Sequence, residues 1–185
     1  MNRLIIILLI LFIAWGTAQA ADKYFTRNGH IYFLSKTDII DIDAHNRQTA
    51  SFLNTKNGDM VFAVIMKLFK FDLALAEEHF NENYVESEKF PKAKFKGRID
   101  NFDKIDVSKN AVHHVTVSGK LSLHGKTKSL KAKGTIEIKD GTIIAKSKFT
   151  IMLKDYSISI PNLVKDKVSK EIIIEIDMLY KPFIK

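Results

Sequence analysis

The sequence predicts an all-β protein, an antiparallel eight-stranded β-barrel with one short α-helical insertion. Apolar and polar residues alternate through most of the chain, and such alternation places every second side chain on one face of a strand. Short turn signals, such as Asn57-Gly58 and Asp140-Gly141, separate the alternating segments. Long strands joined by short turns are typical of a closed barrel or a sandwich. The number of strands favours a barrel, because closure removes exposed strand edges.

The first twenty residues have the layout of a secretory signal peptide. Arg3 gives a charged start, residues 4–15 are continuously apolar, and Ala18-Gln19-Ala20 places small residues where a signal peptidase cleaves. The alternative is an uncleaved membrane anchor, but an apolar run of about a dozen residues is short for a span of about 20. We therefore expect residues 1–20 to be removed and residues 21–185 to form one exported domain, periplasmic or secreted.

The composition limits the classes of function that remain. The chain has no cysteine, which excludes disulfides, thiolate catalysis and cysteine-based zinc sites. Its formal net charge is +8, and the lysines are scattered in ones and twos without an arginine-rich block. This scatter predicts a solvated surface and no nucleic-acid partner, with attraction to an anionic membrane as the alternative. The sequence leaves the oligomeric state open, a homodimer included.

The alternation changes in the middle of the first half of the chain. Strands are expected at residues 30–35, 40–44, 49–54 and 59–70. Residues 73–87 favour a helix instead, with Asp72 placed to cap it. Leu73, Ala76, Phe80 and Tyr84 would share one face of that helix.

After Pro91 the strand pattern returns. Strands are expected at residues 93–99, 115–123, 130–138, 143–153 and 172–178. Each inward face mixes large apolar residues with small ones, namely Gly97, Gly119, Ala132, Gly134 and Ala145. Small inward residues either leave space for a ligand or mark bends in the sheet, and periodicity alone leaves both interpretations open.

Residues with catalytic potential do not form a recognisable motif. His113 and His114 are adjacent on an expected strand, so their side chains point to opposite faces and cannot bind one ion together. His79 lies beside two glutamates without the spacing of a zinc protease. Gly125-Lys126-Thr127 is similar to the end of a phosphate-binding loop, but it joins two strands. We expect no catalytic residues, no metal site and no cofactor.

Three stretches of the chain carry a family resemblance. They are EEHFNENYVESEKFPKAKFKGRI at 77–99, VTVSGKLSLHGKTKSL at 115–130 and FTIMLKDYSISIP at 149–161. In this order and spacing they resemble the YceI family of exported lipid-binding proteins. The resemblance extends over about residues 29–179. Its most specific parts are Phe90-Pro91, Phe95-Lys96-Gly97 and the segment 121–128.

The resemblance implies a lipocalin-like barrel with an elongated apolar cavity. Members of the family are associated with polyisoprenoid or isoprenoid-quinone ligands, and no catalytic residues are established that could be carried over. Burial of apolar surface contributes about 25 cal/mol per Å², so an apolar tunnel binds an isoprenoid tail without a polar motif. We expect a non-enzymatic lipid carrier. The alternatives are a barrel-fold enzyme or chaperone acting on an amphipathic small molecule, and a solid-cored structural protein.

The candidate ligand-binding residues are inward side chains, aromatic side chains near the helix, and polar rings in the matching stretches. They are Phe33, Phe62, Phe69, Phe71, His79, Phe80, Tyr84, Phe90, Phe95, Leu121, Leu123, His124, Phe149, Ile151 and Tyr156. A charged lipid headgroup would need donors at the cavity mouth, for which His124, Lys126 and Lys128 are candidates.

Overall fold

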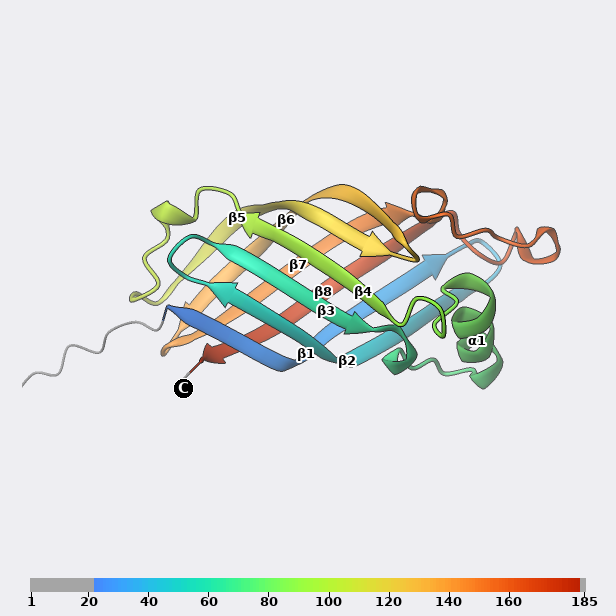
Figure 1. Ribbon diagram of the computed structural model, residues 1–185, viewed down its shortest axis with the longest axis horizontal. Helices are drawn as coiled ribbons and strands as arrows, with labels where there is room; N and C mark the ends of the chain where they lie inside the picture. Colours follow the sequence, from blue (N-terminus) through green and yellow to red (C-terminus); the bar gives the residue numbers. More distant parts are fainter. Residues whose placement is uncertain (1–21, 184–185) are drawn as a thin grey trace, which may run out of the picture.

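The computed structural model describes residues 22–183, which form a closed barrel of antiparallel strands (Figure 1). Each strand pairs with the next along the chain, and the last pairs with the first. The strands are β1 (Lys23–Lys36), β2 (Asp41–Asn54), β3 (Asp59–Ile65), β4 (Lys92–Ile99), β5 (Ala111–Leu123), β6 (Lys126–Lys139), β7 (Thr142–Met152) and β8 (Glu171–Pro182). The predicted eight-stranded barrel is confirmed. The expected signal segment, residues 1–20, lies outside the described residues.

The alternation in the sequence explains which face of each strand is buried. In β4, Ala93, Phe95 and Ile99 are buried, whereas Lys92 and Lys94 are exposed. The apolar side chains fill the interior, and the lysine side chains remain in water, as the period of two predicts.

β2 is one strand where the sequence suggested two, at 40–44 and 49–54. Where the two expected strands join, the interior positions are Asn46 and Thr49, which are fully buried. The Asn46 amide donates to the backbone oxygen of Ile65 at 3.0 Å, and its side-chain oxygen accepts from Thr49 Oγ1 at 3.3 Å. Hydrogen bonding thus satisfies these buried polar groups, and the interior face of the strand is not apolar enough to be recognised from hydropathy.

The insertion between β3 and β4 is confirmed as helical but differs in detail. The expected strand 59–70 ends at Ile65, because the chain turns into a 3₁₀ helix, η1 (Met66–Leu68). The expected helix 73–87 is shorter, with an α-helical turn, α1 (Ala74–His79), followed by a π-helical turn, η2 (Phe80–Tyr84). The expected cap at Asp72 is wrong, since Leu73 is the N-cap residue and no side chain caps the helix.

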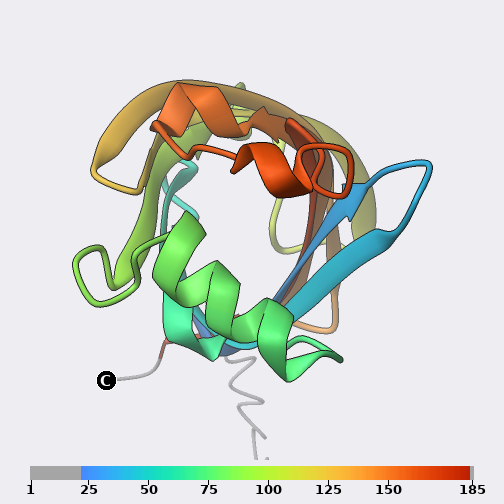
Figure 2. The same ribbon diagram turned by 90° about the vertical axis from the view of Figure 1, so that its right-hand side faces the viewer.

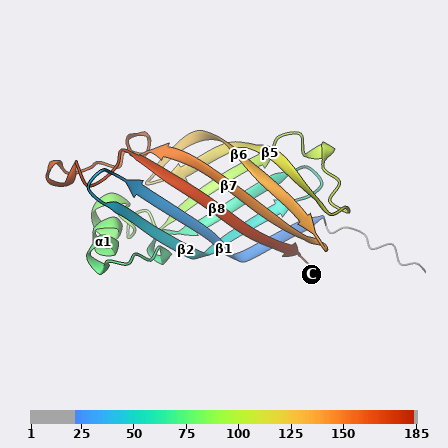
Figure 3. The ribbon, with the colours of Figure 1, turned by 180° about the vertical axis from the view of Figure 1, so that it is seen from behind.

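The two ends of the barrel differ. Figure 2 shows α1 lying across one end, together with the β7–β8 connection that contains η4 (Leu153–Tyr156) and η5 (Asn162–Val164). At the opposite end, η3 (Phe102–Lys104) precedes β5, and the start of β1 lies beside the end of β8 (Figure 3). We call these the helix end and the closed end. Between Asp22 and Phe183, no helix is long and apolar enough to cross a membrane.

The closed end is filled with large side chains that are almost completely buried. They include Tyr24, Leu53, Ile99, Phe102, Ile138, Ile143, Met178 and Tyr180. This end therefore forms a solid floor that holds the barrel together.

The inward glycines of β4 and β5 serve packing. Gly97 and Gly119 are cross-strand partners, and a Cβ atom on either would lie 2.5 Å from Cζ of Phe95. The Phe95 ring therefore occupies the room that the two glycines leave. Ala132, Gly134 and Ala145, by contrast, line a cavity. The interpretation that small inward residues leave space therefore holds for Ala132, Gly134 and Ala145, whereas Gly97 and Gly119 make room for the Phe95 ring.

The wall is incompletely hydrogen bonded between β6 and β7. Their ladder runs only from Gly134 and Ser147 to the turn at the closed end. Towards the helix end, residues 126–133 of β6 pair with β5, and residues 148–152 of β7 pair with β8. The two strands diverge at Gly134, where a Cβ atom would lie 2.5 Å from the carbonyl oxygen of Lys146.

A buried hydroxyl pair links β2 and β8, the two strands that flank β1. The hydroxyl groups of Tyr180 in β8 and Ser51 in β2 are 2.6 Å apart, and Ser51 also hydrogen bonds to the carbonyl oxygen of Val61 at 3.0 Å. Burial raises the pKa of the Tyr180 hydroxyl, and the hydrogen bond with Ser51 opposes this effect only partly. The phenol therefore stays neutral.

We expect Tyr180→Phe to lower the free energy of unfolding by about 1 kcal/mol, the typical net value of one buried hydrogen bond. Chemical denaturation measures the change. The matched control is Tyr32→Phe, because the Tyr32 ring packs half-buried against His45 and its hydroxyl makes no hydrogen bond within residues 22–183. Equal losses in the two variants would contradict the role of the Tyr180 hydroxyl.

Candidate functional site

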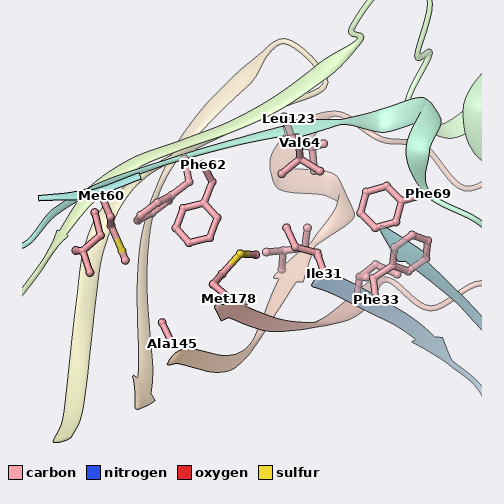
Figure 4. Packing of buried hydrophobic residues seen from close by; sticks show 14 of the residues in the cluster. Ile31, Phe33, Met60, Phe62, Val64, Phe69, Leu123, Ala145 and Met178 are labelled. Carbon is pink, nitrogen blue, oxygen red and sulfur yellow. The ribbon is translucent and has the colours of Figure 1, made fainter. Parts of the chain in front are cut away.

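The helix half of the barrel encloses a cavity of about 650 Å³. This volume lies within the range of roughly 300–1,000 Å³ that is typical of small-molecule sites. Figure 4 shows Phe62 and Val64 pointing into the barrel from one wall, and Ile31 and Met178 from the opposite wall. The cavity begins above the filled floor and reaches residues of α1 and of the β7–β8 connection.

The cavity wall is overwhelmingly apolar. Alternating residues of the strands supply Ile31, Ile42, Met60, Val64, Val115, Val117, Leu130, Ile136, Ile172, Ile174 and Ile176 in addition to the candidate residues treated below. The ionisable side chains of its lining residues belong to His79, Tyr84, Lys146 and Lys167, of which both lysines and the histidine are exposed. The interior thus suits an uncharged, apolar ligand.

Four phenylalanines attach the helical insertion to the barrel. Phe33 of β1 lies with its ring centroid 5.3 Å from Phe69, 5.6 Å from Phe71 and 5.4 Å from Phe80. The Phe80 ring in turn lies 5.1 Å from Phe71 and 5.7 Å from Phe69. Aromatic pairs at these separations are favourable beyond the area they bury. The cluster therefore holds the insertion over the helix end and forms part of the cavity wall.

Most of the candidate residues line the cavity. These are Phe33, Phe62, Phe69, Phe71, His79, Phe80, Tyr84, Phe95, Leu121, Leu123, Phe149 and Ile151. Their contact with a ligand stays a prediction. Phe90, His124 and Tyr156 are not among the lining residues, nor are Lys126 and Lys128, which lie exposed near the β5–β6 turn.

His124 instead joins three segments outside the cavity. Its Nδ1 lies 3.0 Å from the backbone oxygen of Tyr156, and its Nε2 lies 2.6 Å from Oε2 of Glu86. The ring of Phe90 packs edge-on against it at 4.7 Å. These contacts join the β5–β6 turn to the segment after η2 and to η4, so the histidine stabilises the frame of the helix end.

The hydrogen bonds of His124 also affect the pKa of its partner Glu86. A carbonyl oxygen only accepts, so Nδ1 carries a hydrogen and donates it to Tyr156. An ionised carboxylate also only accepts, so Nε2 donates to Glu86 as well. The hydrogen bond from His124 holds the pKa of the Glu86 carboxyl below its ordinary value of 4.5, and burial opposes this only partly. At neutral pH Glu86 is therefore an ionised carboxylate.

Several lining residues were not predicted. Ile158, Val164, Lys167 and Val168 come from the β7–β8 connection, which has neither strand nor helix periodicity in its sequence. Met60 and Val64 of β3 follow the alternation that predicted the strand, and the same pattern would have identified them as inward.

The remaining histidines do not form a metal site. His113 is half-buried and His114 is exposed. Nε2 of His30 lies 2.9 Å from Nδ1 of His45, and burial lowers the pKa of His30. Across residues 22–183, no three histidine, aspartate or glutamate side chains lie close enough to hold a metal ion.

The comparison with protein families gives a match over most of the chain. The family model described as the YceI-like domain matches residues 26–179. None of the curated proteins with which the chain was compared matches it.

Solved structures show the same fold. A polyisoprenoid binding domain from Saccharophagus degradans implicated in plant cell wall breakdown has a TM-score of 0.77, with 13% identity, covering 88% of this chain and 99% of that chain. BcnA of Burkholderia cenocepacia has a TM-score of 0.67, with 13% identity and coverages of 82% and 95%. The Campylobacter jejuni YCEI protein has a TM-score of 0.57, with 14% identity and coverages of 74% and 82%. At such identities the likeness shows the fold alone.

The pair of Glu86 and His124 predicts a pH dependence. Because the pKa of Glu86 is lowered in the folded protein, its contribution to stability is present above the ordinary carboxylate pKa and is lost as the pH falls through the lowered value. We expect Glu86→Gln to reduce the melting temperature at pH 7 and this difference from the unmodified protein to shrink in acid. Thermal unfolding followed by circular dichroism across pH measures it.

The control for this series is Glu78→Gln, which changes an exposed carboxylate of α1 that makes no ion pair among residues 22–183. A melting temperature of Glu86→Gln that follows the unmodified protein at every pH would show that the pair contributes nothing.

Proposed function

Because the chain belongs to the family of YceI-like domains, we propose that it is a non-enzymatic carrier that holds a polyisoprenoid lipid or an isoprenoid quinone in its barrel. The observation that carries the proposal is the apolar cavity of about 650 Å³ above a filled floor. The Saccharophagus degradans domain with the same fold is a polyisoprenoid binding domain, which supports the same class of ligand.

The shape of the cavity fits a chain with one apolar and one polar end. The floor of buried residues, including Ile99 and Tyr180, stops the ligand at the closed end. The tail therefore lies inside, and the headgroup remains at the helix end. Burial of the tail contributes about 25 cal/mol per Å² of apolar surface, without any directional contact.

The polar side chains at the helix end suit a headgroup. Tyr84 lines the cavity, and burial raises the pKa of its hydroxyl, which therefore remains a hydrogen-bond donor. His79 and Lys167 also reach the cavity from two different segments. A neutral donor suits a quinone carbonyl, whereas the ammonium of Lys167 suits a phosphate.

The alternatives receive less support. The cavity argues against a solid-cored structural protein. A barrel-fold enzyme would need polar groups that converge on one reacting atom, whereas His79, Tyr84, Lys146 and Lys167 come to this wall from four separate segments. Export to the periplasm or the exterior remains part of the proposal, and it rests on the signal-like pattern of residues 1–20.

Filling the cavity tests the proposal. Ala132 of β6 is buried, points inward and lines the cavity. A phenyl ring there takes the place of several methylenes of the ligand, each worth about 0.8 kcal/mol, so we expect Ala132→Phe to weaken binding at least about tenfold. The measurement is native mass spectrometry of delipidated protein mixed with an isoprenoid quinone or a polyprenyl phosphate of the same chain length.

The matched control is Ala63→Phe, which adds the same ring to the outer face of β3 between the inward residues Phe62 and Val64. Thermal unfolding checks that both variants fold. Unmodified protein that carries no prenyl lipid from its host and takes up neither probe would refute the carrier function. Uptake of one probe alone identifies the headgroup.

A further inference from the structure

The helix end of the barrel exposes large aliphatic side chains. Among residues 22–183, five large apolar side chains are more than 60% exposed, and four of them lie at this end. They are Ile39 at 63%, Leu73 and Leu75 at 62% each, and Leu163 at 94%; the fifth is Val112, at the closed end. Exposed apolar side chains are ordinary when scattered singly, whereas a group around one opening needs an explanation.

These side chains come from three separate segments that surround the cavity. Ile39 lies in the β1–β2 turn, Leu73 and Leu75 lie in the α1 segment, and Leu163 lies in η5. Figure 2 shows these three segments arranged around the end of the barrel. Leu73 and Leu75 also line the cavity, so the exposed apolar surface is continuous with its interior. We call these four residues the apolar rim.

One flank of the barrel is strongly basic. β4, β5 and β6 carry Glu137 as their single acidic residue. Many of the exposed side chains on these strands are cations, of which we call the following seven the basic face: Lys92, Lys94, Lys96, Arg98, Lys120, Lys131 and Lys133. In the part of the chain that the structure describes, none of the seven makes an ion pair. Their charge is therefore available to an external partner.

We propose that the helix end docks onto an anionic lipid bilayer, with the apolar rim in the headgroup region and the barrel tilted so that the basic face approaches the membrane. The proposal rests on the carrier function, since the cavity would then open directly onto the source of its lipid. The rim segments also contain acidic residues, including Asp38, Asp72 and Asp166. Electrostatic attraction to an anionic bilayer must therefore come from the basic face. The barrel consequently tilts so that this face approaches the membrane.

The same end is suited to a bilayer for a second reason. Aliphatic side chains on short turns insert between lipid headgroups, whereas a protein partner would require a continuous complementary surface. The rim residues are separated by an opening, which a bilayer spans and fills. Clustered lysines provide the accompanying attraction to anionic lipids, which weakens with salt.

The test is cosedimentation of the purified protein with vesicles that contain no prenyl lipid. One set consists of phosphatidylcholine alone, and the other of phosphatidylcholine and phosphatidylglycerol in equal parts. We expect affinity for the anionic vesicles to be about tenfold higher and to fall as salt is added. Equal binding to both sets, or binding to neither, would overturn the proposal.

Two pairs of variants identify the surface. The double substitution Ile39→Asp and Leu163→Asp changes rim residues outside the cavity wall, and we expect it to weaken vesicle binding about tenfold. Its control is Val112→Asp at the closed end, which should bind as the unmodified protein does.

The second variant is Lys94→Glu with Lys96→Glu and Lys120→Glu on the basic face. The control replaces exposed lysines nearer the closed end, as Lys104→Glu, Lys139→Glu and Lys181→Glu. Both sets change the net charge equally, so only the first should weaken binding. If charge reversal on the basic face abolishes binding while the aspartates at the rim leave it unchanged, the flank binds anions in general and the docking geometry is wrong.

The docking proposal and the carrier proposal can be refuted independently of each other. Each variant is also given a prenyl lipid in detergent, which requires no membrane. Protein that takes up the lipid from detergent but does not sediment with anionic vesicles refutes docking alone. Protein that sediments with the vesicles but takes up no prenyl lipid refutes the carrier function alone.

Discussion

The structure depends on closure of the sheet, in which the last strand, β8, pairs with the first strand, β1. Closure gives each of the eight strands a neighbour on both sides and brings inward residues from along residues 22–183 into one interior. That interior is too wide for its side chains to fill over the full length. Leu53, Ile138 and Tyr180 fill one half, while Ala132, Gly134 and Ala145 line the other half and leave a cavity. The inward side chains thus determine both how the barrel packs and where its cavity lies.

The helical insertion shields the apolar wall of the cavity from water at the helix end. A barrel open at one end would expose the apolar wall to water. The aromatic cluster of Phe33, Phe69, Phe71 and Phe80 covers much of that end and is itself part of the wall. The hydrogen bond between Glu86 and His124 fixes the neighbouring turn, and that between His124 and Tyr156 fixes η4, both from outside the cavity. Apolar contacts therefore shape the site, and polar contacts hold its frame.

The sequence predicted the barrel and much of the wall because strand alternation identifies inward residues, as it did for Phe95 and Phe149. It failed where polar residues occupy interior positions, as Asn46 does, since hydropathy does not register a hydrogen-bonded polar side chain. It also missed the β7–β8 connection, because residues such as Val168 reach the cavity through tertiary packing rather than through a local period. The motif around His124 proved to mark a structural junction outside the cavity.

The divergence of β6 from β7 beyond Gly134 makes the barrel mechanically uneven along its axis. Near the floor, the ladder from Gly134 and Ser147 to Lys139 and Thr142 holds β6 and β7 at a fixed separation. Towards the helix end, residues 126–133 and 148–152 can separate further without breaking a ladder hydrogen bond between them. In the proposed carrier, the half with complete ladders would limit the length of the lipid tail, and the half where β6 and β7 diverge would widen for headgroups of different size.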